Sequence, residues 1–286
     1  MRRAAAVILV IGLLLAGCGG EVAEETTVPS TVAASSTMAA TTTLAPTTST
    51  GVAPVWDVVA LGDSYVAGAG LGLGGSDDPE KAFPGVYARA LAEQIGVEVV
   101  LHPYIDYGTV AQWNQRLAAS GGMAEQIAEA EVMIVWLGYH NVVNPLYFQT
   151  CGTAWPEPLR TCLQEATETM PADFDQLLGS IEDLVPEGAV VMVANQGLSP
   201  IEIDEWGDEP FWPELKAVAF DGWSAGVEAA AAAHEAIFVD SAVWLMGPDG
   251  DQVLHREFLL PDGIHFTEAG HEALADLFLA ADGLGT

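Results

Sequence analysis

The chain has 286 residues, half of them hydrophobic, and carries 40 acidic against 8 basic residues, for a net charge of −32. This length supplies a full core for one sizeable α/β domain or two small ones. The basic residues are scattered, so the chain lacks the Lys and Arg clusters that bind nucleic acid, and its charge would repel anionic substrates.

The N-terminus has the pattern of a secretory signal. Arg2 and Arg3 precede an apolar run over residues 4–16, which is shorter than the roughly 20 residues of a membrane span. The run ends in Leu-Ala-Gly-Cys, which resembles the lipobox of bacterial lipoproteins. The resemblance implies that residues 1–17 are removed and that Cys18 becomes a lipidated N-terminus. The alternative is an ordinary secreted protein. We expect an extracytoplasmic protein anchored to the bacterial cell membrane.

Residues 18–54 have the composition of a tether. Thr, Ser, Ala and Val dominate, three prolines interrupt the segment, and no aromatic residue occurs in it. Such a segment cannot bury enough apolar area to offset the entropy of ordering it, so we expect it to be disordered. It would join the lipid to a folded domain over residues 55–286.

In the domain, short apolar runs alternate with helical patterns. The apolar runs predict strands over 57–61, 97–101, 132–137, 189–194 and 236–239. The helical patterns predict helices over 82–94, 109–118, 123–130, 172–184, 213–234, 243–246 and 267–281. Five near-continuous apolar strands separated by helices predict an α/β fold with a parallel sheet covered on both faces.

Residues 142–171 do not fit this alternation. They contain several aromatic side chains and the two late cysteines, Cys151 and Cys162, and they follow the third predicted strand. We predict an insertion that walls or caps a pocket. In an oxidising compartment the two cysteines would form a structural disulfide. The alternative is a metal site, but no second cysteine pair or suitably spaced histidine lies nearby.

Two motifs at opposite ends of the domain carry candidate chemistry. The first predicted strand stops at Gly62-Asp63-Ser64, and ligands of open α/β sheets bind at the carboxyl ends of strands. Near the C-terminus, Asp262 and His265 lie three residues apart in a predicted turn. At that spacing the carboxylate can bind one imidazole nitrogen and leave the other as a base for a serine.

Together these motifs resemble those of the SGNH/GDSL hydrolase family, over about residues 55–281. The resemblance implies a flavodoxin-like, three-layer αβα sandwich with a five-stranded parallel sheet. It also implies a serine esterase in which Ser64 is the nucleophile, His265 the general base and acid, and Asp262 its orienting carboxylate. The substrate would be a small-molecule or glycan ester. We expect a monomer without a metal or cofactor.

The family builds its oxyanion hole from the serine N–H, a glycine N–H and an asparagine side chain. Gly108 matches the glycine, but the family's Gly-x-Asn-Asp is replaced by Gly-Tyr-His-Asn at residues 138–141. Strict alignment puts His140 in the asparagine position, whereas a one-residue shift would bring in Asn141, which we favour. One such donor is worth roughly 10²–10³ in rate. A catalytically weak or inactive cell-surface binding protein on this fold is therefore an alternative, as is a deacetylase of surface polysaccharide.

A second serine motif occurs at Gly222-Trp223-Ser224-Ala225-Gly226. It matches the Gly-x-Ser-x-Gly elbow of α/β-hydrolases, which needs a strand before the serine and further strands after it. Residues 213–234 are predicted to be helical, and only 60 residues follow Gly226. We therefore do not expect Ser224 to be a nucleophile.

Overall fold

The computed structural model describes residues 54–142, 159–196, 207, 210–250 and 252–284. The predicted signal segment, lipid site and tether lie outside these residues, as does most of the predicted insertion. Within the described part of the chain, no helix is long and apolar enough to cross a membrane.

One sheet of five parallel strands forms the centre of the domain, as predicted. Its strands are β1 (Val55–Gly62), β2 (Glu98–Ile105), β3 (Val132–Trp136), β4 (Val190–Ala194) and β5 (Ile237–Val239). Their order is β2-β1-β3-β4-β5, so the chain changes direction across the sheet between β1 and β3. In open α/β sheets this switch point is where ligands bind.

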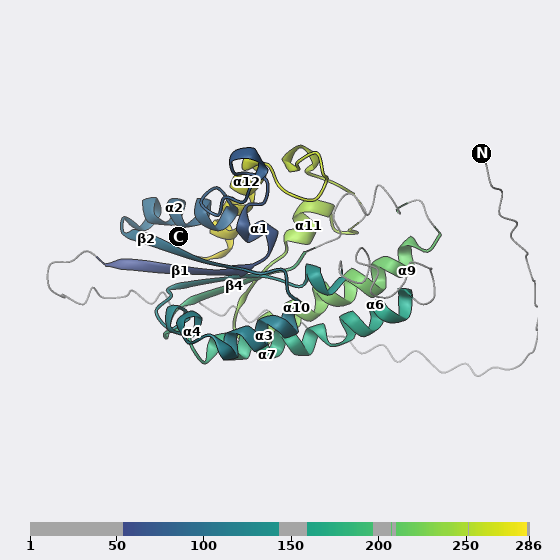
Figure 1. The fold of residues 1–286 in the computed structure, drawn as a ribbon, viewed down its shortest axis with the longest axis horizontal. Coiled ribbons are helices and arrows are strands. Elements are labelled where there is room, and N and C mark those ends of the chain that lie inside the picture. Colours follow the sequence, from purple (N-terminus) through teal and green to yellow (C-terminus); the bar gives the residue numbers. More distant parts are fainter. Residues whose placement is uncertain (1–53, 143–158, 197–206, 208–209, 251, 285–286) are drawn as a thin grey trace, which may run out of the picture. The chain divides into compact units, whose positions relative to one another are not determined.

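Helices cover both faces of the sheet, which gives the predicted three layers (Figure 1). One face carries α1 (Ser64–Ala67), α2 (Phe83–Ile95), α11 (Ser241–Met246) and α12 (Glu268–Ala281). The other carries α3 (Val110–Ala119), α4 (Gly121–Ile127), α7 (Met170–Glu182) and α10 (Gly222–Ala233). On these faces α12 packs on α2, and α10 packs on α7.

Two details differ from the sequence prediction. The segment treated as an insertion contains a helix, α6 (Leu159–Glu168), which packs against α7. The long helix predicted over 213–234 is divided into α9 (Trp212–Lys216), a π-helical turn (Ala217–Asp221) and α10. Short 3₁₀ turns occur at Leu73–Gly75 and Arg256–Phe258.

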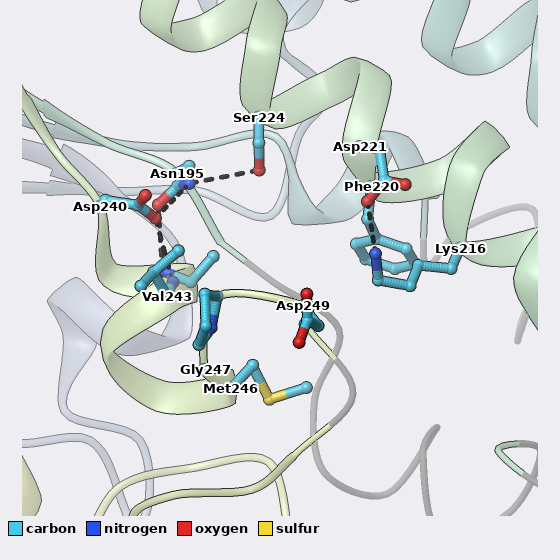
Figure 2. A pocket seen from close by; sticks show the side chains of 13 residues that line it. Asn195, Lys216, Phe220, Asp221, Ser224, Asp240, Val243, Met246, Gly247 and Asp249 are labelled. Atoms are coloured by element: carbon cyan, nitrogen blue, oxygen red, sulfur yellow. Dashed lines mark hydrogen bonds and ion pairs between the residues drawn. The ribbon is translucent and has the colours of Figure 1, made fainter.

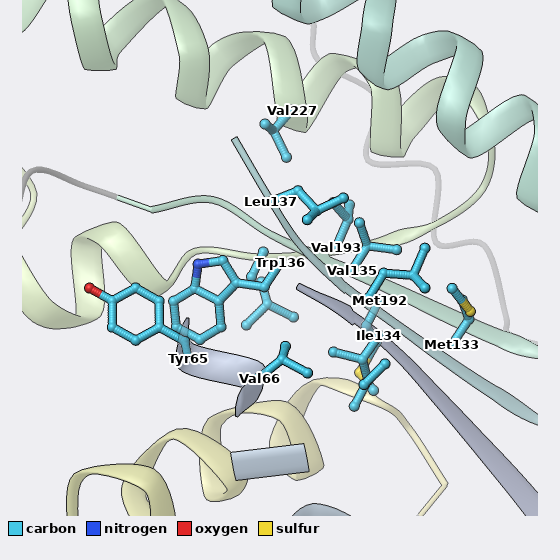
Figure 3. Packing of buried hydrophobic residues seen from close by; sticks show 14 of the residues in the cluster. Tyr65, Val66, Met133, Ile134, Val135, Trp136, Leu137, Met192, Val193 and Val227 are labelled. Atoms are coloured by element: carbon cyan, nitrogen blue, oxygen red, sulfur yellow. The ribbon is translucent and has the colours of Figure 1, made fainter. Parts of the chain in front are cut away.

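The core reaches the carboxyl edge of the sheet through aromatic side chains. Trp136, the last residue of β3, lies with its ring centroid 5.2 Å from that of Tyr65 and 5.1 Å from that of Phe83. Figure 3 shows Tyr65 against Trp136 at the end of this cluster. Because Tyr65 follows Ser64 in the chain, close packing of its ring anchors the turn that carries the serine.

Candidate active site

The turn after β1 presents Ser64. Asp63 caps α1 through a hydrogen bond from the Tyr65 N–H to its Oδ1 (3.4 Å), and Ser64 is the first residue of that helix. A Cβ on Gly62 would collide with the Val66 side chain, so only glycine allows α1 to pack this closely against the end of β1. Ser64 is partly exposed while its neighbours Asp63 and Tyr65 are buried.

The predicted Asp262–His265 pair is formed. The ring Nδ1 of His265 donates to Asp262 Oδ2 at 2.8 Å, and Asp262 Oδ1 accepts from the backbone N–H groups of Ile264 (2.9 Å) and His265 (3.0 Å). Gly263, at φ +71°, allows the turn. With Nδ1–H engaged, Nε2 is the acceptor of the neutral ring.

These contacts keep Asp262 ionised. Burial acts to raise the pKa of its carboxyl group. The hydrogen bonds from the His265 ring and from the N–H groups of Ile264 and His265 outweigh burial and hold the pKa below its ordinary value. Asp262 can therefore stabilise a positive charge on the imidazole when His265 takes up a proton.

The fold brings this pair to the Ser64 turn from the other end of the chain. The His265 ring lies 6.2 Å from the Tyr65 ring, centroid to centroid, and the Tyr65 hydroxyl donates to the Ile264 carbonyl at 3.1 Å. Among the described residues, the Ser64 hydroxyl makes no hydrogen bond to His265. Catalytic hydrogen bonds are often long before substrate binds.

Gly108 and Asn141 lie together on the β2–α3 side of the site. Gly108 is buried, and a Cβ there would lie 2.9 Å from Asp106 Oδ1. Asn141 is buried as well, and its Oδ1 accepts from the Val110 N–H at 3.0 Å. This bond ties the end of the β3 loop to the first turn of α3.

His140 lies beside the serine turn. Its Nε2 is 3.8 Å from Asp63 Oδ2, and its side chain is 13% exposed. The Tyr107 ring packs edge-on against it, with the centroids 5.5 Å apart. Burial raises the pKa of the Asp63 carboxyl group, and the nearby His140, the Tyr65 N–H and His265 only partly offset that rise. The residue before the candidate nucleophile is thus a buried acid that faces two histidines.

The sequence analysis missed two polar side chains at the carboxyl edge of the sheet, Tyr65 and Gln196. Gln196, two residues beyond β4, donates from Nε2 to the Tyr65 hydroxyl at 3.0 Å. Both side chains are buried. The adjacency of Tyr65 to the serine was a signal, but nothing in the sequence pointed to Gln196.

The second serine motif lies elsewhere, on helix α10. Ser224 accepts a hydrogen bond from Asn195 Nδ2 at 3.2 Å and lines a separate cavity with Asp240 and Lys216 (Figure 2). No histidine is among the described residues that line this cavity. Gly226 serves packing, because a Cβ there would lie 2.8 Å from Pro171 Cγ on α7. The motif is therefore no nucleophile elbow.

The remaining sequence predictions concern cysteines and metals. Cys162 lies in α6, but Cys151 is outside the described residues, so their pairing stays a prediction. No group of three or more His, Cys, Asp or Glu side chains in the described part of the chain is placed to hold a metal ion.

Fold and site together define an αβα-sandwich hydrolase with a serine and an Asp-His turn at the switch point of its sheet. The chain belongs to the GDSL-like lipase/acylhydrolase family, whose model matches residues 60–273. This membership supports an ester-cleaving hydrolase. No curated protein matches the chain.

Solved structures show the same fold at low sequence identity. A lipase from a goat rumen metagenome is 21% identical with a TM-score of 0.61, and the match covers 80% of this chain and 98% of the lipase. For an extracellular lipase from Streptomyces rimosus the identity is 18%, the coverages are 79% and 99%, and the TM-score is 0.56. A mutant acetyl-xylooligosaccharide esterase from Geobacillus is 15% identical with a TM-score of 0.56, and the match covers 80% of this chain and 94% of the esterase.

Proposed function

We propose that this protein is an exported serine esterase that cleaves carboxylic esters through an acyl-enzyme on Ser64. The observation that carries the proposal is the Asp262–His265 pair, whose engaged Nδ1 leaves Nε2 as a base beside the serine turn. The Ser64 hydroxyl attacks the ester carbonyl and passes its proton to His265 Nε2. His265 then protonates the departing alcohol, and water activated by the same nitrogen hydrolyses the acyl-enzyme.

The oxyanion of the tetrahedral intermediate needs donors, and we assign these to the N–H groups of Ser64 and Gly108 and to the His140 ring. His140 is preferred to Asn141, which we favoured from the sequence. Its Nε2 lies beside the serine turn, 3.8 Å from Asp63 Oδ2. The hydrogen bond from the Val110 N–H holds the Asn141 side-chain amide at the N-terminus of α3.

Labelling with a fluorophosphonate probe tests the nucleophile. We expect the probe to label the wild-type chain and the control Ser224→Ala but not Ser64→Ala. Labelling that persists in Ser64→Ala would contradict the mechanism.

Turnover of p-nitrophenyl acetate and butyrate should fall by about 10⁴ or more in His265→Ala. Such a loss from robust wild-type turnover would exclude a mere binding protein on this fold.

The substrate class is a small-molecule or glycan ester. A polysaccharide deacetylase is the second candidate, because an acetyl-xylooligosaccharide esterase is among the proteins that share the fold. Acetyl release from acetyl-xylan and from acetylated peptidoglycan, measured beside an acyl-length series of nitrophenyl esters, separates the two. Faster release from a polymer than from any simple ester would favour the deacetylase.

We also propose that the enzyme acts outside the cytoplasm, held to the membrane by lipid on Cys18 and spaced from it by residues 19–54. The Leu-Ala-Gly-Cys sequence and the tether composition support this location. Lipoprotein-type anchoring uses several acyl chains, which hold a membrane stably where one chain does so only marginally.

A further inference from the structure

Tyr65 has a buried ring, and its hydroxyl group bonds to two other residues of the described part of the chain. The side chain is 2% exposed, and its ring lies against Trp136 (Figure 3). The centroid of the Tyr65 ring is 5.2 Å from that of Trp136 and also 5.2 Å from that of Phe266. The hydroxyl accepts from Gln196 Nε2 at 3.0 Å and donates to the Ile264 carbonyl at 3.1 Å. One oxygen atom therefore links α1, the end of β4 and the turn before α12.

The Ile264 carbonyl leads directly to the candidate catalytic pair. It belongs to the same peptide group as the His265 N–H, which donates to Asp262 Oδ1 at 3.0 Å. The other oxygen of Asp262 accepts from His265 Nδ1 at 2.8 Å. Hydrogen bonds thus run without a break from Gln196 through Tyr65, the 264–265 peptide and Asp262 to the imidazole ring.

We propose that Tyr65 is a positioning residue, whose hydroxyl holds the 262–265 turn against the Ser64 turn and sets the orientation of the His265 ring. This inference rests on the proposed function of the site. Tyr65 neighbours the nucleophile in the chain and reaches the base through the fold, so it couples the two halves of the site. Successive hydrogen bonds polarise one another, and the Gln196–Tyr65 end of this chain is buried, whereas Asp262 is exposed.

Packing alone does not account for the tyrosine. A phenylalanine would fill the same space against Trp136 and Phe266. A buried hydroxyl costs free energy unless it is bonded, and this one is bonded to the turn that carries the base. A shift of that turn by about 1 Å would be enough to weaken proton transfer strongly.

The test compares Tyr65→Phe with Tyr87→Phe in the full-length chain. Tyr87 is a matched control, because it is fully buried and its hydroxyl donates to Asp282 Oδ2 at 2.8 Å. That bond joins α2 to the end of α12 and has no link to the hydrogen-bonded chain. Both variants lose one buried hydroxyl and should lower Tm, but only Tyr65→Phe should affect the chemistry.

For Tyr65→Phe we expect kcat on p-nitrophenyl acetate to fall about tenfold, as the loss of one positioning hydrogen bond would predict, with KM within about twofold. The rate of fluorophosphonate labelling should fall by a similar factor while its end-point, which counts folded sites, stays complete. Tyr87→Phe should leave kcat and labelling rate unchanged. A Tyr65→Phe enzyme with wild-type kcat and labelling rate would overturn the proposal.

The low-field proton NMR signal of His265 Nδ1–H separates this inference from the proposed function, because it is recorded without substrate. We expect the signal to move or broaden in Tyr65→Phe and to stay in place in Tyr87→Phe, whether or not the wild type hydrolyses esters. An unchanged signal in Tyr65→Phe would contradict the positioning role. A wild-type chain that shows the signal but reacts with no probe would contradict only the proposed esterase.

Discussion

At the scale of single residues, the contact between Asp63 and His140 distinguishes this site. A carboxylate that is 2% exposed lies beside the candidate nucleophile, and a histidine faces it where the family has asparagine. A buried charge is stable only with compensating partners. His140, the first of the groups that offset the effect of burial on Asp63, therefore has a structural reason as well as a proposed chemical one to occupy this position.

Two substitutions distinguish the candidate oxyanion donors. Asn141→Asp keeps an oxygen acceptor for the Val110 N–H but removes the amide donor, so we expect kcat to change by less than about tenfold. His140→Ala removes the proposed donor and should lower kcat by about 10²–10³. Steady-state kinetics on p-nitrophenyl acetate give both values. A larger loss of kcat in Asn141→Asp than in His140→Ala would assign the role to Asn141. If His140 is the donor, His140→Asn should have a higher kcat than His140→Ala, because asparagine also carries an N–H group.

At the scale of elements, a histidine joins α7 to α10. His234 follows the last turn of α10, where its Nδ1 is 2.7 Å from Glu182 Oε2 and its Nε2 is 3.1 Å from Asp175 Oδ1. Both carboxylates belong to α7. The ring lies over Gly179, where a Cβ would come within 3.1 Å of Cε1. The hydrogen bond to Glu182, followed by the contacts with Asp175, raises the pKa of His234 above its ordinary value of 6.5, although burial opposes the rise.

This raised pKa predicts a pH-dependent contribution to stability. Folded His234 holds its proton more tightly than the unfolded chain does, so its contribution is complete below pH 6.5 and is lost as the pH rises through the folded-state pKa. We expect His234→Gln to lower Tm relative to wild type at about pH 5.5, and much less at about pH 9. Thermal unfolding of both proteins across this range measures the difference.

The comparison with wild type at each pH is essential, because another histidine acts in the opposite direction. Burial lowers the pKa of His271 to about 4, and its Nδ1 accepts from the Phe83 N–H at 3.0 Å. The contribution of neutral His271 to folding stability therefore falls as the pH drops below 6.5. Because wild type and variant share His271, this effect cancels in the difference between their Tm values. Glu182→Gln should reproduce the His234→Gln result, and an equal Tm loss at both pH values would contradict the ion-pair account.

At the scale of the whole molecule, the sequence predicted what short contiguous patterns encode. The five strands are mainly apolar runs, so the sequence predicted their number and their order along the chain. The Ser64 and Asp262–His265 motifs are local, so the sequence predicted them as well. The hydrogen bonds of Tyr65 join residues 131 and 199 positions apart, which only the fold brings together. The helix α6 was not predicted, because it lies in a segment that does not fit the alternation of apolar runs and helical patterns. The choice between His140 and Asn141 stays a proposal.

The last prediction concerns where the molecule resides. A net charge of −32 would repel an anionic membrane. If the proposed lipid at Cys18 is the anchor, membrane association should depend on that cysteine. In a bacterial host we expect the full-length chain to take up an alkyne fatty acid and to partition into detergent. Cys18→Ser should do neither, whereas the control Cys151→Ser should do both. A Cys18→Ser protein that stays with the membrane would contradict the anchor.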